Sequence, residues 1–219
     1  MQQSTIPNRK AVLLINLGTP DRPTFGAVYR YLTEFLNDPL VVDVPLVFRL
    51  ILVNLLIIPK RAKAVARLYQ QLWGEGGSPL MAYSLRQQEL LQKRLGSETK
   101  VFLAMRYQSP SISSVMAQIE KEGFSVIHII PLFPQFARAT NLSVIRECER
   151  VIKRWKVAPS VIWTKHFATH PVFIDALIAQ SETLAVADYD HVLFSFHGLP
   201  VRQIEKAHEK LSYCGDGLC

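Results

Sequence analysis

The sequence predicts an α/β protein in which a parallel β-sheet is flanked by helices. Strongly apolar runs recur along the chain, and most are followed by a segment whose apolar residues have helical spacing. A run that is apolar at nearly every position is typical of a strand buried on both faces, as in a parallel sheet. Strands that alternate with helices predict right-handed crossovers, which place helices on both faces of the sheet.

The predicted strands share this apolar character. The first ends at Gly18, which interrupts the run. In such sheets ligands bind at the carboxyl ends of strands, near the point where strand order reverses. We therefore expect the functional site in the loops that follow Leu17, Tyr107, Leu132 and Phe196. The strands are expected at residues 11–17, 101–107, 126–132, 161–165 and 191–196.

The predicted helices have recognisable ends. Pro110 precedes one of them and Gly123 follows it, a typical start and stop. Thr169 or His170 is placed to cap the last one. The helices are expected at residues 24–36, 62–73, 82–95, 111–122, 142–155 and 171–184.

Length and charge limit the classes of function. The 219 residues, 49% of them hydrophobic, suffice for one large or two small domains. The net charge of +7 suits nucleic acid, anionic lipid or a small anion, and equally a solvated basic surface. No basic block is long enough for a nucleic-acid arm, so we expect no such partner. The densest cluster is Lys60, Arg61, Lys63 and Arg67.

The stretch from Leu46 to Ile58 is strongly apolar, but Arg49 and Asn54 interrupt it. It is shorter than the roughly 20 residues that cross a bilayer. We interpret it as a helix that is half core and half lip, and we favour burial in the core over contact with a membrane surface. Because residues 1–10 are polar, we expect no signal peptide and a cytoplasmic location.

Two short motifs carry weaker signals. The glycine-rich segment 74–79 ends in Pro79, which excludes a dinucleotide fingerprint, and a flexible turn is the favoured interpretation. Arg106 and Tyr107 end a predicted strand, where the guanidinium could pair with a ligand carboxylate or form a surface ion pair.

The cysteines are too few for a disulfide framework, and reduced thiols are expected in a cytoplasm. Cys214 and Cys219 have the spacing with which plant-type iron–sulfur sites open. Two thiols cannot hold a cluster, so free thiols are favoured for this pair and for Cys148.

His197 follows the last predicted strand, and Gly198 and Pro200 bend the chain after it. An unperturbed pKa of about 6.5 suits proton transfer at neutral pH. We predict that His197 is the reaction centre, with a hydrogen-bonded structural histidine as the alternative.

An ordered series of motifs resembles the ferrochelatases. They cover most of the chain, and the series is far more specific than any single member. The motifs are LINLGTP at 14–20, YL at 31–32 with FLND at 35–38, GGSPL at 76–80, MRY at 105–107, PLFPQF at 131–136 and SFHGLP at 195–200.

The resemblance implies a chelatase fold of two similar Rossmann-like lobes, expected at residues 1–160 and, incompletely, at 161–219. It implies a lyase that inserts Fe²⁺ into protoporphyrin IX to form protohaem, the terminal step of haem biosynthesis, and we expect a monomer. His197 matches the invariant histidine that handles metal and protons. The apolar stretch from Leu46 to Ile58 falls where family members carry a lip that can face a membrane. The positions that match porphyrin contacts or line the same cleft are Leu17, Arg61, Tyr69, Ser78, Arg106 and Tyr107.

The sequence also departs from the family pattern. Family members are usually rich in serine and threonine at 137–141, whereas Thr140 is the only such residue here, and a charged segment replaces the usual sequence after the histidine motif. Some bacterial relatives carry a [2Fe-2S] cluster near this place, which makes Cys214 and Cys219 candidate first ligands. Family members are longer, and the remainder would supply a glutamate facing the histidine.

Several alternatives stay open. A truncated chain could be a non-catalytic porphyrin or haem binder. The substrate could be coproporphyrin, although Tyr69 and the segment 76–79 look more like the protoporphyrin type. A cobalt chelatase fits the fold but not the ordered motifs, and the absence of a Gly-x-Ser-x-Gly elbow argues against a hydrolase.

Overall fold

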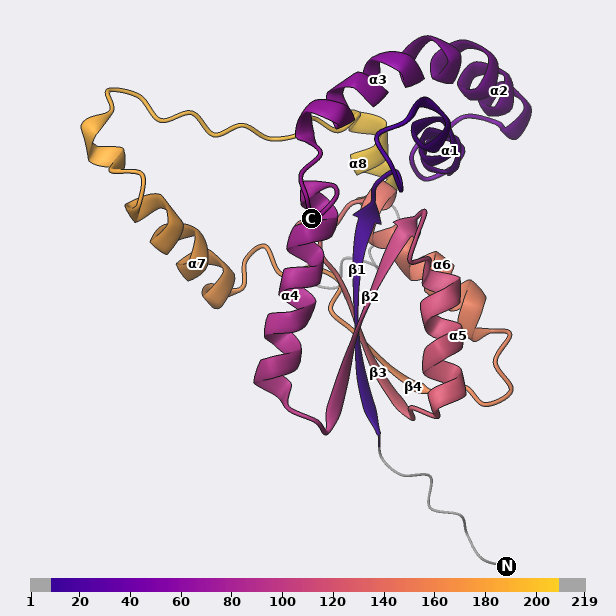
Figure 1. The fold of residues 1–219 in the computed structure, drawn as a ribbon, viewed down its shortest axis with the longest axis vertical. Coiled ribbons are helices and arrows are strands. Elements are labelled where there is room, and N and C mark those ends of the chain that lie inside the picture. The colour runs from indigo at the N-terminus through magenta and orange to yellow at the C-terminus, as the bar shows by residue number, and fades with distance from the viewer. Residues whose placement is uncertain (1–8, 209–219) are drawn as a thin grey trace, which may run out of the picture.

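The computed structural model describes residues 9–208, which form a parallel four-stranded sheet flanked by helices (Figure 1). The strand order is β2-β1-β3-β4. The predicted α/β class is confirmed. The strands are β1 (Lys10–Gly18), β2 (Thr99–Tyr107), β3 (Val126–Pro131) and β4 (Ser160–Trp163).

The central strand β1 is buried on both faces, as its continuous apolar run predicts. Leu13 and Ile15 pack with α5 (Ile112–Glu122) and α6 (Ser143–Ile152) on one face. Val12 and Leu14 face the other side, where α4 (Pro79–Leu95) covers β1 and β2. Strand β2 lies on one side of β1 in the sheet, and the next strand along the chain, β3, lies on the other side of β1. The order therefore reverses between β1 and β3, which is where such sheets bind ligands.

The helix ends follow local capping chemistry. Thr24 caps α1 (Phe25–Leu36), and its hydroxyl accepts a hydrogen bond from the Ala27 amide. Ser111 caps α5 in the same way, and Gly123 ends that helix in the left-handed conformation. The start and stop predicted for α5 are confirmed. His170 occupies the N-cap position of α7 (Pro171–Glu182) but its side chain makes no capping bond.

A helical run from residue 46 to residue 72 lies across the carboxyl edge of the sheet. It consists of α2 (Leu46–Ile51), a π-helical segment η1 (Leu52–Ile57) and α3 (Ile58–Leu72). Only a narrow face of this helical run packs against the body, through Val53, Ile58 and Ala62, which contact α1. The preference for a core helix at 46–58 was wrong, since most of its apolar side chains are exposed: Phe48 is 71% exposed and Leu55 is 68% exposed.

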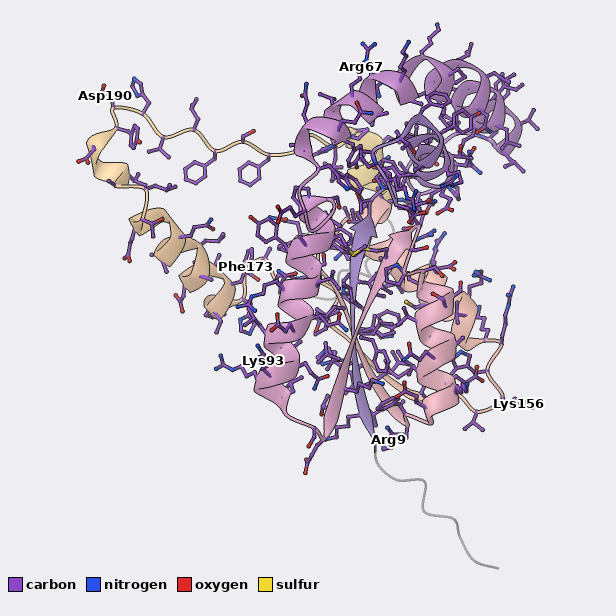
Figure 2. All side chains as sticks on the ribbon, viewed as in Figure 1. Arg9, Arg67, Lys93, Lys156, Phe173 and Asp190 are labelled. Carbon is purple, nitrogen blue, oxygen red and sulfur yellow. The ribbon has the colours of Figure 1, made fainter. Side chains whose placement is uncertain are left out.

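The prediction of a strand at 191–196 was also wrong. These residues form an extended segment with no strand ladder, and Leu193 is 92% exposed. An extended apolar segment becomes a strand only beside a partner, and residues 9–208 offer none at this place. The segment belongs to an arm that includes α7, of which no residue is buried, and the short helix η3 (Val186–Asp188). Figure 2 shows the labelled Asp190 at the far end of this arm, away from the sheet.

The arm returns to the body through α8 (Val201–His208). The remaining element is a second π-helical segment, η2 (Arg138–Leu142), which leads directly into α6. The sheet continues beyond residue 160, because β4 pairs with β3. Within residues 9–208, no helix has the length and apolar character needed to cross a membrane.

Candidate functional site

The carboxyl ends of β1 and β2 approach each other unusually closely. Gly18 is the register partner of Tyr107 and has a φ of +109°. A Cβ at this position would lie 2.0 Å from the Tyr107 carbonyl oxygen. Both the backbone angle and the space therefore require glycine. This approach holds the half-buried Leu17 at the edge of the sheet beside Tyr107.

A buried carboxylate gathers the polar groups of this edge. Asp38, which follows α1, is only 6% exposed. Its Oδ2 accepts hydrogen bonds from Arg106 Nη2 at 2.7 Å and from Tyr107 Oη at 2.9 Å. The Ser143 hydroxyl donates to the same oxygen. Arg106 Nε donates to Ser143 Oγ at 2.7 Å, which closes the network.

Within this network Arg106 has an ion-pair partner in the chain itself. Its guanidinium forms an ion pair with a carboxylate of this chain, and that pair is largely buried. The guanidinium also lies 4.6 Å from the centre of the Tyr107 ring. Arg106 therefore shapes the edge of the sheet through Asp38 and Tyr107, and its charge is already compensated.

Burial governs the ionisation of the tyrosines near this edge. Burial raises the pKa of Tyr107, and the neighbouring Asp38 carboxylate raises it further. Burial also raises the pKa values of Tyr31 and Tyr69. All three phenols therefore stay neutral at physiological pH and act as hydrogen-bonding aromatic groups.

Aromatic rings connect Tyr69 to Tyr107. The ring centres of Tyr69 and Tyr31 are 6.4 Å apart, and those of Tyr31 and Phe35 are 5.9 Å apart. Phe35 in turn lies 5.3 Å from Tyr107. At the other end, Trp73 lies 6.2 Å from Tyr69. These distances suit favourable aromatic packing, and the row joins α3, α1 and β2.

Ser78 lies at the start of α4. It is 2% exposed, and its hydroxyl accepts a hydrogen bond from the Met81 amide as the N-cap of the helix. Ser78 lines a cavity of about 160 Å³ together with Thr19, which follows β1, and Trp73. The glycine-rich segment 74–79 is a tight turn closed by two hydrogen bonds between Gly74 and Gly77, as its interpretation as a turn predicts.

Two predicted site residues lie apart from this cluster. Arg61 is exposed on α3, among other exposed cations, and Figure 2 labels Arg67 on the same helix. His197 is exposed on the extended segment before α8. Within residues 9–208, the side chains of Arg61 and His197 make no hydrogen bond and no ion pair. Among the same residues, no group of three or more His, Cys, Asp or Glu side chains could hold a metal ion. Cys214 and Cys219 lie outside the described residues.

An apolar surface covers the outside of α2 and η1. It includes an apolar groove of about 390 Å³. The groove is lined by Val44, Pro45, Phe48, Ile51, Leu52 and Leu56.

Asp38 was not among the site residues predicted from the sequence. It stands within the FLND motif, and the strand-end arginine that pairs with it was recognised. A signal was therefore present, but the two residues are 68 positions apart in the sequence, so the contact could not be recognised. Ser143 gave no comparable signal.

Comparison with known proteins identifies the family. A family model described as ferrochelatase matches residues 9–214. A ferrochelatase of Opitutus terrae is 41% identical over 210 residues, which cover 95% of this chain and 61% of the relative. One of Pseudomonas fluorescens biotype C is 39% identical over 95% of this chain and 61% of the relative. One of Serratia proteamaculans is 41% identical over 96% of this chain and 66% of the relative.

The chain thus spans about three fifths to two thirds of the length of these curated relatives. The match extends from the residue before β1 to beyond α8, so it covers the sheet, the aromatic row and the histidine motif. The chain belongs to the ferrochelatase family.

Proposed function

We propose that this chain acts in a ferrochelatase, a lyase that inserts Fe²⁺ into protoporphyrin IX to form protohaem in the terminal step of haem biosynthesis. One observation carries the proposal. Leu17, Tyr69, Ser78 and Tyr107, which the family resemblance assigns to the porphyrin cleft, come from β1, α3, the start of α4 and β2. They gather at the carboxyl edge of the sheet, and the row of rings from Trp73 to Tyr107 gives that edge an aromatic wall.

The macrocycle is flat, apolar on its faces and anionic at its propionates. The aromatic row suits contact with the flat face. Because the charge of Arg106 is compensated by Asp38, the exposed guanidinium of Arg61 is the better candidate to bind a propionate. Arg106 would then act on the porphyrin through the position of Tyr107.

His197 is proposed to handle the proton and metal chemistry. Two pyrrole N–H protons leave the macrocycle as Fe²⁺ enters, and a neutral imidazole accepts one proton or ligates the metal. The second proton requires another base, a role for the glutamate that the family resemblance implies. A rigid binding wall also supplies the strain that puckers the macrocycle and exposes its nitrogen lone pairs.

The test is a His197→Ala variant. We expect it to bind protoporphyrin with unchanged affinity, measured by fluorescence quenching, but to lose insertion of Fe²⁺ or Zn²⁺, followed by porphyrin absorbance. His191→Ala is the matched control, because His191 is exposed on the same extended segment. Near-normal insertion by His197→Ala would refute the role of His197.

The same assay separates the remaining alternatives. A wild-type chain that binds porphyrin but inserts no metal would support a non-catalytic porphyrin or haem binder. Protoporphyrin and coproporphyrin are assayed side by side, and we expect faster metal insertion into protoporphyrin.

Finer properties belong to the same proposal. We place the protein in the cytoplasm as a monomer, in peripheral contact with the inner face of a membrane through the exposed apolar surface of α2 and η1. We assign the arm and α8 to the start of a second lobe, after the sheet ends at β4. Cys214 and Cys219 are proposed as free thiols, with ligation of a [2Fe-2S] cluster as the alternative.

A further inference from the structure

The helix that follows the histidine motif is held to the body by several polar contacts. Helix α8 begins at Val201, and its first turn closes on Pro200, three residues after His197. Gln203 Nε2 donates a hydrogen bond to the Val41 carbonyl at 3.1 Å. Arg138 Nη1 donates to the Lys206 carbonyl at 3.1 Å, near the carboxyl end of the helix where a cation is favoured.

Asp43 supplies the charged part of this attachment. Lys206 Nζ donates to Asp43 Oδ2, and Arg202 Nε lies 3.5 Å from the same oxygen. Both cations stand on α8, one turn apart, so they converge on one carboxylate. The Asp43 side chain is 26% exposed, and that of Lys206 is 30% exposed, so water screens this pair only in part. Lys206 and Arg202 hold the pKa of Asp43 below its usual value.

The loop that carries Asp43 is itself anchored to the sheet edge. Asp38 Oδ1 accepts a hydrogen bond from the Leu40 amide at 2.8 Å, and the Asp38 carbonyl accepts from the Val41 and Val42 amides. The other oxygen of Asp38 binds Arg106 and Tyr107. The same loop leads into α2, which begins three residues after Asp43. Residues 38–43 therefore join three parts: the end of β2, the start of the exposed apolar helix, and α8.

We propose that Asp43 is a positioning residue for His197. By holding α8, it fixes the carboxyl end of the histidine segment relative to the Tyr107 edge and to α2. The segment has no strand ladder of its own within the described residues, so this attachment is what orients its end. The proposal rests on the proposed function for its catalytic consequence, but the attachment itself is tested without catalysis.

Two departures from the family pattern meet in this attachment. Arg138 lies in segment 137–141, where Thr140 is the only serine or threonine, and Lys206 lies in the charged segment after the histidine motif. The hydrogen bond from Arg138 to the Lys206 carbonyl joins the two segments, so both contribute to holding α8.

The first experiment measures hydrogen exchange in the full 219-residue chain. Asp43→Asn removes the charge, and we expect exchange in residues 198–208 to rise about threefold, the effect of losing a partly exposed ion-pair network. Asp43→Glu is expected to restore most of the protection. Glu205→Gln, an equal change of charge on an exposed residue of α8, should leave exchange unchanged. Equal hydrogen exchange of residues 198–208 in Asp43→Asn and in the wild type would show that Asp43 does not hold α8.

The second experiment measures metal insertion with Zn²⁺ and protoporphyrin. If Asp43 positions His197, Asp43→Asn lowers kcat about tenfold with little change in KM for the porphyrin, because a small misplacement of a reacting group costs rate and not binding. Asp43→Glu recovers kcat, whereas a purely structural loss in Asp43→Asn would lower the fraction of active molecules and leave kcat per active molecule unchanged. An unchanged kcat in Asp43→Asn overturns the positioning role. A wild-type chain that neither binds porphyrin nor inserts metal contradicts the proposed function instead, and the exchange experiment still decides the attachment.

Discussion

Asp38 is the residue on which the polar geometry of the site depends. One of its oxygens accepts from Arg106, Tyr107 and Ser143, which come from a strand end and a helix start far apart in the chain. A guanidinium that loses its buried carboxylate is left as an uncompensated charge. The shape of the sheet edge therefore depends on a side chain that comes from the segment after α1 and not from the sheet itself.

We expect Asp38→Asn to lower the free energy of unfolding by roughly 3 kcal/mol, because it leaves Arg106 buried without a counter-charge. Urea unfolding followed by circular dichroism measures the change. Asp175→Asn on the exposed helix α7 is the control and should change stability by less than about 0.5 kcal/mol. Equal stability of the two variants would show that the Asp38 network contributes nothing to folding.

His128 on β3 gives the fold a dependence on pH. Its Nε2 lies 2.8 Å from Thr164 Oγ1, and burial lowers its pKa below the ordinary value of 6.5. The unfolded chain therefore takes up this proton before the folded chain does as pH falls. The contribution of His128 to stability is complete above pH 6.5 and is lost as pH falls through the lower folded pKa.

We expect His128→Gln to lose less stability than wild type between about pH 7.5 and about pH 5.5, because it removes the titrating group from this window. Urea unfolding at both pH values gives the difference. His191→Gln, which removes an exposed histidine, should titrate like the wild type. The idea fails if wild type and His128→Gln lose equal stability.

At the scale of the element, α2 and η1 present apolar side chains outward while α3 presents cations. Lys60, Arg61, Lys63 and Arg67 are all exposed on α3. An apolar surface beside cations is the arrangement that binds anionic lipid surfaces. Residues 46–58 were expected to form a helix that is half core and half lip, with the core favoured, and their real position could not be read from composition alone. Which face of an apolar helix meets the core depends on what packs against it, and here the inward face is the narrow one formed by Val53, Ile58 and Ala62.

We expect Phe48→Glu with Leu55→Glu to weaken binding to vesicles that contain anionic lipid by at least about tenfold, because each exposed apolar side chain contributes more than about 1 kcal/mol on burial. Vesicle sedimentation measures the bound fraction. Leu90→Glu, at an exposed position of α4, is the matched control and should bind like wild type. Equal binding by all three proteins would remove the membrane contact from the proposal.

At the scale of the whole molecule, the described residues form a well-packed sheet with its helices and an arm whose side chains are mostly exposed. Helix α7 buries no residue, and Phe194 and Phe196 are largely exposed. The chain spans 61–66% of the length of the relatives compared above. In our proposal the arm starts a second lobe, whose remaining strands would pair with residues 191–196. Helix α8, through its contacts with Val41, Asp43 and Arg138, ties the end of the arm back to the body.

The sequence by itself determined the parallel α/β architecture, the start and stop of α5, and the family. These follow from local signals: continuous apolar runs, helical spacing, capping residues and an ordered set of motifs. Tertiary structure alone decided that Asp38 pairs with Arg106, that α2 and η1 face outward, and that residues 191–196 form no strand. Each of these depends on which distant segments become neighbours, and hydrogen-bond partners and burial exist only once the chain has brought those segments together.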